Sequence, residues 1–398
     1  MKRTFLYIIA GIAAVLVLPL LYAYIAFPAG YVNRVFRWGD ADVYDYQKFP
    51  SRTLGISGRP LGFAYSPDED HVRAQFCKAA GVDNFDVFLE KNRTQAFIVI
   101  RNDAILYEKY FNGAARDAVV TSFSTAKSFT SALIGIAMAE GYIRSIDDPV
   151  TRYLPELSKR DPAFGKITIR NLLMMSSGIR YREFPFVNGD DAKTYYYPDL
   201  RHLALHDTYI DAVPGEKFLY NNYHPLLLGM ILERATGMHV AEYLQNKIWK
   251  PAGMEYEGSW SLDESGFEKM ESGINARAVD FAKFGRLFMH NGAWGGVQVV
   301  PAQWVAESTR ADESVRYTDY YGNDFIFRNG RGYYKYMWWG IKRNPASYDF
   351  MALGNHGQFM YVSPGTKIII VRFGESYGSF GGAEGWINLF DAFSAGYR

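Results

Sequence analysis

The sequence predicts an α+β fold with two lobes, built on one antiparallel β-sheet that carries a mainly helical insertion. Strand-like segments lie at two distant places, over residues 96–110 and 358–373. Between them, residues 142–290 have mostly helical and loop patterns. Strands at both ends of a domain with helices between them are typical of one sheet completed by both ends of the chain. We therefore expect this sheet to be flanked by N- and C-terminal helices.

Composition narrows the class of protein. The chain has 398 residues, of which 48% are hydrophobic and 21% charged, so it can bury a large core. Its formal net charge is +1 and it has no basic block, which argues against nucleic-acid binding. Cys77 is the single cysteine, which excludes an intramolecular disulfide. We interpret it as a buried small residue rather than a reactive thiol.

The N-terminus predicts a membrane anchor. A basic n-region over residues 1–5 precedes an uncharged stretch over residues 6–27. At about 1.5 Å per residue this stretch would reach about 33 Å, enough for a bilayer core of about 30 Å. Its length favours an uncleaved signal anchor over a cleaved signal peptide. The basic residues before it predict a cytoplasmic N-terminus and a catalytic domain outside the cytoplasm.

The rest of the chain divides at about residue 90. Residues 28–90 are polar and aromatic and predict an extracytoplasmic lead-in, and residues 91–398 predict the main domain. A hairpin is expected over residues 96–110, with its turn at 101–103. An apolar stripe with helical period begins at Phe129 and predicts a helix that ends near Gly141. Further helices are expected near residues 226–235, 279–290 and 386–395.

Ser124 and Lys127 form a candidate catalytic pair at the start of the helix that contains Phe129. Residues three apart on a helix lie on one face, so the Lys127 amine can reach the Ser124 hydroxyl. A serine hydroxyl needs a base to become a nucleophile, and a lysine needs burial or positive surroundings to be neutral near pH 7. The apolar helix and its N-terminal dipole favour both conditions. The pattern predicts a serine hydrolase.

A second candidate element follows 96 residues after Ser124. Tyr220 and Asn222 form a Tyr-x-Asn sequence just before the helix expected near residues 226–235. A phenol beside a cationic lysine loses its proton more easily and can carry it between nucleophile and leaving group. The Asn222 carboxamide can bind a substrate amide or cap the helix, and the sequence leaves both open.

Together these motifs resemble the serine β-lactamase and penicillin-binding protein superfamily. The chain is most similar to the class C β-lactamase-like branch, which includes family VIII esterases, D-amino-acid peptidases and 6-aminohexanoate-dimer hydrolases. The resemblance rests on Ser-x-x-Lys at 124–127 and Tyr-x-Asn at 220–222, with support from residues 167–179 and 229–237. It implies a β-lactamase/transpeptidase-like fold. It also implies Ser124 as the acylated nucleophile, Lys127 as its proton partner, Tyr220 as general base and acid, and Asn222 as a substrate contact.

The third motif departs from the family pattern. Where the family has Lys-Thr-Gly or His-Thr-Gly on a strand beside the site, this chain has Gly354-Asn355-His356-Gly357-Gln358. The resemblance implies that His356, Gly357 and Gln358 contact substrate, with His356 in the cationic place. The missing threonine and final glycine favour ester or small amide substrates over carboxylate-bearing β-lactams.

Other constellations carry less chemistry. His202 and His206 are four residues apart, but no metalloprotease glutamate follows His202 and no third ligand is evident, so we expect no metal. Phosphate-binding and dinucleotide-binding glycine loops are absent from the sequence, so we expect no cofactor. The Tyr run at 195–197 is either a substrate-binding overhang or an exposed loop, and the Trp pair at 338–339 is expected near the sheet.

We therefore predict a serine hydrolase that cleaves a small ester or amide through an acyl-enzyme on Ser124. Two alternatives remain: a penicillin-binding-type protein or β-lactamase acting on peptidoglycan peptides or β-lactams, and a catalytically inactive binding or scaffold protein on the same fold. The sequence gives no oligomeric state.

Overall fold

An eight-stranded sheet forms the centre of the protein. The computed structural model describes residues 17–312, 314–315, 317, 325–344 and 347–397. The sheet order is β10-β11-β12-β13-β14-β3-β4-β2, and all neighbours are antiparallel except β2 and β4. The strands are β2 (Ala64–Tyr65), β3 (Thr94–Arg101), β4 (Ala104–Tyr110), β10 (Gly332–Lys335), β11 (Trp338–Asn344), β12 (Ser347–Gly354), β13 (Gln358–Ser363) and β14 (Ile368–Gly374). The pairing of β14 with β3 confirms that both ends of the domain complete one sheet.

The predicted hairpin is formed by β3 and β4. Its two turn residues, Asn102 and Asp103, have φ values of 50° and 63°. Positive φ at both central positions matches the right-handed twist of a two-residue hairpin, and Asn and Asp tolerate it better than most residues.

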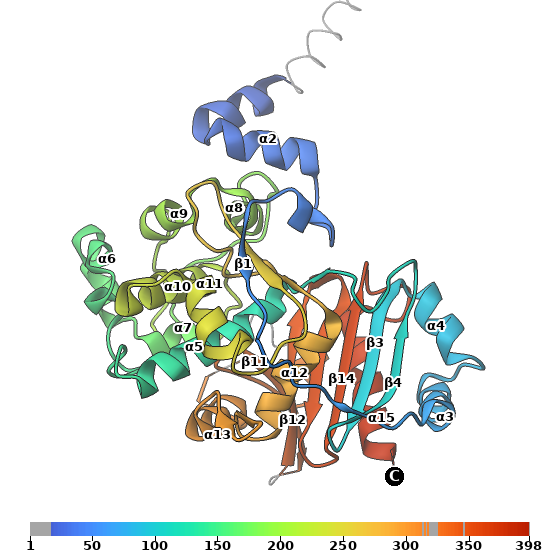
Figure 1. Ribbon diagram of the computed structural model, residues 1–398. Coiled ribbons are helices and arrows are strands. Elements are labelled where there is room, and N and C mark those ends of the chain that lie inside the picture. The colour runs from blue at the N-terminus through green and yellow to red at the C-terminus, as the bar shows by residue number, and fades with distance from the viewer. Residues whose placement is uncertain (1–16, 313, 316, 318–324, 345–346, 398) are drawn as a thin grey trace, which may run out of the picture.

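Helices cover both faces of the sheet (Figure 1). Along β14, successive side chains point to opposite faces: Arg372 lies under Trp386 of α15, whereas Phe373 contacts Phe281 of α12. On the α15 face, Phe76 of α3 stacks on Phe393. These helices are α3 (Glu69–Ala80), α4 (Phe85–Lys91), α12 (Ala278–Met289) and α15 (Gly382–Gly396). Flanking N- and C-terminal helices are thus confirmed.

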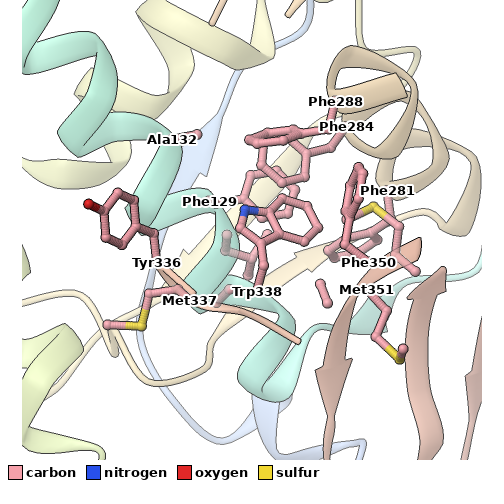
Figure 2. Close-up of a cluster of buried hydrophobic side chains, with 14 of the residues drawn as sticks. Phe129, Ala132, Phe281, Phe284, Phe288, Tyr336, Met337, Trp338, Phe350 and Met351 are labelled. Carbon is pink, nitrogen blue, oxygen red and sulfur yellow. The ribbon is translucent and has the colours of Figure 1, made fainter. Parts of the chain in front are cut away.

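A large aromatic cluster fixes the helix that follows Ser124 (Figure 2). Helix α5 (Ala126–Ala139) contributes Phe129, whose ring stacks on Phe284 of α12 at 3.6 Å between centroids. Trp338 of β11 lies beside Phe284 and meets Phe350 of β12 edge to face. The start of α5 is therefore held rigidly against the sheet.

The helical lobe lies beside the sheet. It contains α6 (Pro155–Arg160), α7 (Ile169–Leu173), α8 (Asp190–Tyr196), α9 (Leu200–His206), α10 (Tyr223–Thr236) and α11 (Val240–Leu244), with short helical turns η3 (Val150–Arg152), η4 (Pro162–Lys166) and η5 (Gln245–Trp249). The region expected to be helical, residues 142–290, also includes two strands of a second sheet. That sheet has the order β1-β6-β7-β5 and joins β1 (Ser51–Leu54), β5 (Val120–Thr121), β6 (Gly258–Ser261) and β7 (Ile274–Ala276).

Smaller elements complete the described chain. They are α2 (Ala29–Trp38), η1 (Asp45–Gln47), η2 (Phe123–Thr125), β8 (Ala293–Trp294), β9 (Val297–Gln298), α13 (Ala302–Thr309), α14 (Phe325–Arg328) and η6 (Asn355–Gly357). Helix α2 packs on the helical lobe through Tyr31, whose hydroxyl donates to the Val187 carbonyl at 2.7 Å. The lead-in over residues 28–90 is therefore folded onto the domain, since β1 pairs with β6 and β2 with β4.

The predicted membrane anchor over residues 6–27 is wrong in the described part of the chain. Residues 6–16 lie outside the described residues. In the described part of the chain, no helix has the length and hydropathy needed to cross a bilayer. The described helical stretch over residues 17–26 ends before Pro28. We withdraw the anchor and the position outside the cytoplasm that depended on it.

Candidate active site

Ser124 lies in the turn η2, which leads directly into α5. The preceding residue, Phe123, has a φ of 42°, a conformation that costs on the order of 1–3 kcal/mol in a residue with a side chain. Backbone hydrogen bonds hold the strand before the turn, because Ser122 N–H donates to the Ile274 carbonyl at 2.8 Å. The Ser122 hydroxyl also accepts from Ile274 N–H at 3.0 Å. We call η2 the nucleophile turn after the role predicted for Ser124, and it is a strained segment fixed from β7.

Lys127 is buried one helical turn after Ser124. Its Nζ lies 2.7 Å from Ser124 Oγ and donates to the Glu271 carbonyl at 3.0 Å. Burial lowers the pKa of Lys127 to about 7, although the negative charges of Glu271 and Asp191 act in the opposite direction. A substantial fraction of this amine is therefore neutral near pH 7. The structure brings Ser124 and Lys127 together with the spacing that the sequence predicted.

Tyr220 lies beside this pair. The Lys127 Nζ is 4.8 Å from the centre of the Tyr220 ring, and Trp339 stacks on the same ring at 5.5 Å. Burial raises the pKa of Tyr220 well above 10, and its interaction with the Ser124 hydroxyl only partly opposes this rise. The neighbouring lysine was expected to make the phenol more acidic, but desolvation dominates. Tyr220 is a protonated phenol near neutral pH.

Asn222, the last residue of the Tyr-x-Asn sequence, lies beside the same site. Its Nδ2 donates to the Tyr181 hydroxyl at 2.8 Å, whereas its buried Oδ1 has no hydrogen-bond partner among the described residues. Asn222 occupies the N-cap position of α10 but makes no capping bond with its side chain. Asn221 supplies a local bond instead, since its Oδ1 accepts from Tyr223 N–H at 2.9 Å. The unsatisfied Asn222 oxygen would recover a hydrogen bond from a bound N–H donor.

Asp191 is a site residue that sequence reasoning missed. Its Oδ1 accepts a short hydrogen bond from the Tyr181 hydroxyl and a longer one, 3.4 Å, from Asn222 Nδ2. Asp191 is exposed as a residue, but desolvation of its carboxyl group raises its pKa, and its negative charge acts on Lys127. In the sequence, Asp190 and Asp191 have only the acidic signature of a helix start, which carries no functional signal.

The third motif lies against the nucleophile turn through its first glycine. A Cβ on Gly354 would lie 2.4 Å from the Ser122 carbonyl oxygen and 3.1 Å from Phe123 Cβ. Only glycine lets the end of β12 approach the chain next to Ser124 so closely. This contact brings the turn over residues 355–358 to the site despite its unusual sequence.

The side chains of that turn already have partners within the protein. His356 Nε2 donates to the Ala41 carbonyl at 2.8 Å, and the Gln358 amide exchanges two hydrogen bonds with Gly374. The Gly357 carbonyl accepts from the buried Arg372 guanidinium at 2.7 Å. Substrate contact by these three residues remains a prediction.

Ser177 and His224 form a second serine–histidine pair. Ser177 Oγ lies 2.6 Å from His224 Nε2, and both residues are buried. Burial and the Lys127 charge lower the pKa of His224 to about 3, so its ring is neutral. Without solvent access, this pair supports the structure around α10 and is not a candidate nucleophile.

One group of side chains has metal-ligating spacing within the described residues. Glu233, His239 and Glu268 place three possible ligand atoms within 4.8 Å of one another. Arg201 binds both oxygens of Glu233, and Arg52 pairs with Glu268, so the two carboxylates are already balanced in charge. The histidine pair considered in the sequence analysis, His202 and His206, lies on α9 with ring centres 4.5 Å apart.

The tyrosine run at 195–197 packs between the helical lobe and the lead-in. The Tyr195 ring stacks on the Phe123 ring with 6.5 Å between ring centres. The Tyr196 ring packs edge to face on Trp38, and the Tyr197 ring packs against Tyr31. The run is therefore not an exposed loop, and Tyr195 touches the nucleophile turn, so substrate binding by this residue stays a prediction.

Comparisons with known proteins identify relatives of this chain. Residues 84–392 match the family described as Beta-lactamase. The 6-aminohexanoate-dimer hydrolase of Paenarthrobacter ureafaciens is 28% identical over 319 residues, which cover 77% of this chain and 79% of that protein.

Solved structures share the fold. A Bacillus anthracis structure described as "Putative 6-aminohexanoate-dimer hydrolase" has a TM-score of 0.75 and 25% identity, covering 90% of this chain and 92% of its own. A class C beta-lactamase has a TM-score of 0.60 and 15% identity, covering 83% of this chain and 98% of its own, and supports the fold alone. Since the family match covers more than half of the chain, the protein is a hydrolase of the Beta-lactamase family.

Proposed function

We propose that the protein hydrolyses a small amide or ester through an acyl-enzyme on Ser124. The observation that carries this proposal is the 2.7 Å contact between Ser124 Oγ and the buried Lys127 Nζ, whose pKa lies at about 7. A nucleophile needs a base that is neutral at the working pH and within hydrogen-bond reach, and this lysine meets both conditions.

The roles follow from the two pKa directions. Lys127 takes the Ser124 proton as Oγ bonds to the substrate carbonyl carbon. Tyr220, which holds its proton near neutral pH, gives it to the leaving nitrogen or oxygen as that bond breaks, and it regains a proton from Lys127. Water then attacks the acyl ester, and its proton returns through the same groups to Ser124. This assignment keeps the acid role expected for Tyr220 and gives the role of base to Lys127.

The substrate class follows from the charge beside the nucleophile. The negative charge of Asp191 acts on Lys127, so this part of the site favours a cationic group of the substrate and disfavours an anionic group at the same place. The related hydrolase from Paenarthrobacter ureafaciens is named for a 6-aminohexanoate dimer. An amide that carries an ammonium group near Asp191 fits both observations. The 6-aminohexanoate dimer also ends in a carboxylate, so the feature that distinguishes it from a carboxylate-bearing β-lactam is its cationic group.

Active-site labelling tests this proposal. The full chain is treated with a fluorophosphonate probe and assayed with p-nitrophenyl esters, nitrocefin, D-Ala dipeptides and 6-aminohexanoate dimer. We expect wild-type labelling that Ser124→Ala abolishes, and turnover of esters and the amine-bearing amide above nitrocefin. Equal labelling of Ser124→Ala would refute the nucleophile. A burst of one equivalent followed by negligible turnover would instead favour a penicillin-binding-type protein.

A further inference from the structure

A segment of the lead-in reaches the nucleophile turn from outside the family match. We call residues 41–48, which follow α2, the N-terminal strap. In Figure 1 it is the blue segment that descends toward β1 between α8 and the sheet. The Ala41 carbonyl accepts from His356 Nε2 at 2.8 Å, and Asp45 Oδ2 accepts from the Tyr195 hydroxyl at 3.0 Å. The strap thus joins the end of the sheet to the helical lobe.

Several hydrogen bonds hold the Asp45 side chain in the strap. It is 1% exposed, and its Oδ1 pairs with Lys48 Nζ at 2.6 Å. Its Oδ2 also accepts from Asp42 N–H at 3.1 Å. A buried carboxylate with this many donors has little freedom, so the Tyr195 hydroxyl is held in one position.

Both side chains that the strap holds lie against the residue before the nucleophile. The Phe123 ring lies 5.0 Å from His356 and stacks on Tyr195 at 6.5 Å. Phe123 has a positive φ, a conformation that persists only where the surroundings enforce it. His356 and Tyr195 are among those surroundings.

Tyr195 also connects to Lys127 by a second route. Its carbonyl accepts from Lys269 Nζ at 2.5 Å, and the same Nζ lies 4.1 Å from the centre of its ring. Lys269 forms a buried ion pair with Glu271 at 2.9 Å. The Glu271 carbonyl in turn binds Lys127 Nζ. One tyrosine therefore touches the supports of both members of the catalytic pair.

We propose that Asp45 is a positioning residue for the reaction, acting through Tyr195 on the nucleophile turn. The proposal rests on the proposed role of Ser124. The strap lies before residue 84, where the match to the family model begins. Loss of the Asp45–Tyr195 bond leaves the fold in place and lets Phe123 relax, which moves Ser124 away from its productive geometry.

Single-atom and conservative variants of the full chain test this. Tyr195→Phe removes the hydroxyl, Asp45→Ala removes the acceptor, and Asp45→Asn keeps an acceptor oxygen. The matched control is Tyr107→Phe, which removes a similar tyrosine–carboxylate bond of 2.7 Å to Asp86 on a buried residue of β4. Each variant is measured for its rate of fluorophosphonate labelling, for kcat and KM with a p-nitrophenyl ester, and for melting temperature.

We expect Tyr195→Phe and Asp45→Ala each to lower the labelling rate and kcat about 10-fold with little change in KM. Asp45→Asn should recover most of the rate, and the double variant should be no slower than either single variant because both break one interaction. Tyr107→Phe should keep the wild-type rate even where its melting temperature falls.

Three results would overturn the inference. They are wild-type rates in Tyr195→Phe, additive losses in the double variant, and an Asp45→Asn rate no higher than that of Asp45→Ala. If Asp45→Ala does not fold, Tyr195→Phe decides, since it removes one oxygen. Labelling of Ser124→Ala would refute the proposed function itself, whereas normal rates in the strap variants with an unlabelled Ser124→Ala would refute the strap alone.

Discussion

The Ser124–Lys127 pair and the His356–Gln358 turn both adjoin the nucleophile turn, but their polar groups are used differently. The pair is local: two residues one helical turn apart contact each other at 2.7 Å. In the turn, the polar side chains bind distant backbone, since His356 reaches Ala41 and Gln358 reaches Gly374. Chemistry set by helical spacing can be predicted from a motif, whereas the use of a motif's side chains depends on what the rest of the chain brings to them.

The largest effect should come from the local pair. Lys127→Met keeps the length and burial of the side chain but removes the amine that contacts Ser124. We expect kcat for a p-nitrophenyl ester to fall about 10³-fold, because proton transfer by a positioned group contributes about 10²–10⁴-fold. The melting temperature should not fall, because burial disfavours the charged amine. Activity within tenfold of wild type would assign the base to another group.

The pH dependence should report the same lysine. Its pKa of about 7 predicts that kcat/KM falls as the pH drops below 7, because the protonated amine cannot accept the Ser124 proton. Between pH 7 and pH 5 the neutral fraction, and with it the rate, should fall about 50-fold. A flat profile over this range would contradict Lys127 as the base.

The free energy of unfolding should also depend on the protonation of Lys127, and the pKa shift fixes the direction of this dependence. The folded-state pKa of Lys127 is depressed from 10.5 to about 7, so the folded protein binds fewer protons than the unfolded chain between these values. Linkage then makes the lysine's contribution to the free energy of unfolding rise with pH through this window and stay at its lowest below pH 7. In Lys127→Met this rise should disappear, which urea unfolding at pH 6.5 and 9 measures against wild type.

Asp191→Asn should give a smaller and selective effect. The change keeps the size of the side chain and removes the negative charge beside Lys127. We expect KM for an amine-bearing amide to rise about 10-fold, while KM for a neutral p-nitrophenyl ester stays within about twofold. The acidic limb of kcat/KM should also move to lower pH, since Asp191 raises the pKa of Lys127. An equal rise in both KM values would contradict recognition of a cation.

Much of this arrangement could be predicted because it is encoded locally. Short alternating or apolar runs predicted β3, β4, β13 and β14, and helical spacing predicted the Ser124–Lys127 contact. Strands β10 to β12 were not predicted, because buried charges interrupt their pattern. Asp349 is an example: Arg343 and the Tyr361 hydroxyl balance it only in the folded sheet. Asp191 was missed because in the sequence it has only the acidic signature of a helix start, and folding alone brings it to Tyr181 and Lys127.

The wrong membrane prediction shows what the length and hydropathy of a segment cannot predict. An uncharged run was interpreted by its length alone, although Pro28 lies at its end. In the described part of the chain the helix stops before that proline, and α2 then packs on the helical lobe through one face. Pro28 therefore marks the end of that helix, and length and hydropathy alone do not establish a membrane span.

His356 should give the smallest effect and the sharpest test of the comparison. If its main partner is the Ala41 carbonyl, His356→Gln keeps an N–H donor for that bond and should change kcat less than about threefold. His356→Ala removes the donor and should cost more than His356→Gln in kcat. If His356 instead took the cationic place of the family motif, His356→Gln would weaken binding of carboxylate-bearing ligands selectively. Protection of Ser124 from fluorophosphonate labelling by nitrocefin measures this, with p-nitrophenyl acetate as the neutral control. A selective loss of nitrocefin affinity above about tenfold would show that His356 contacts substrate. The third motif would then act directly in the site, as Ser124 and Lys127 are proposed to do.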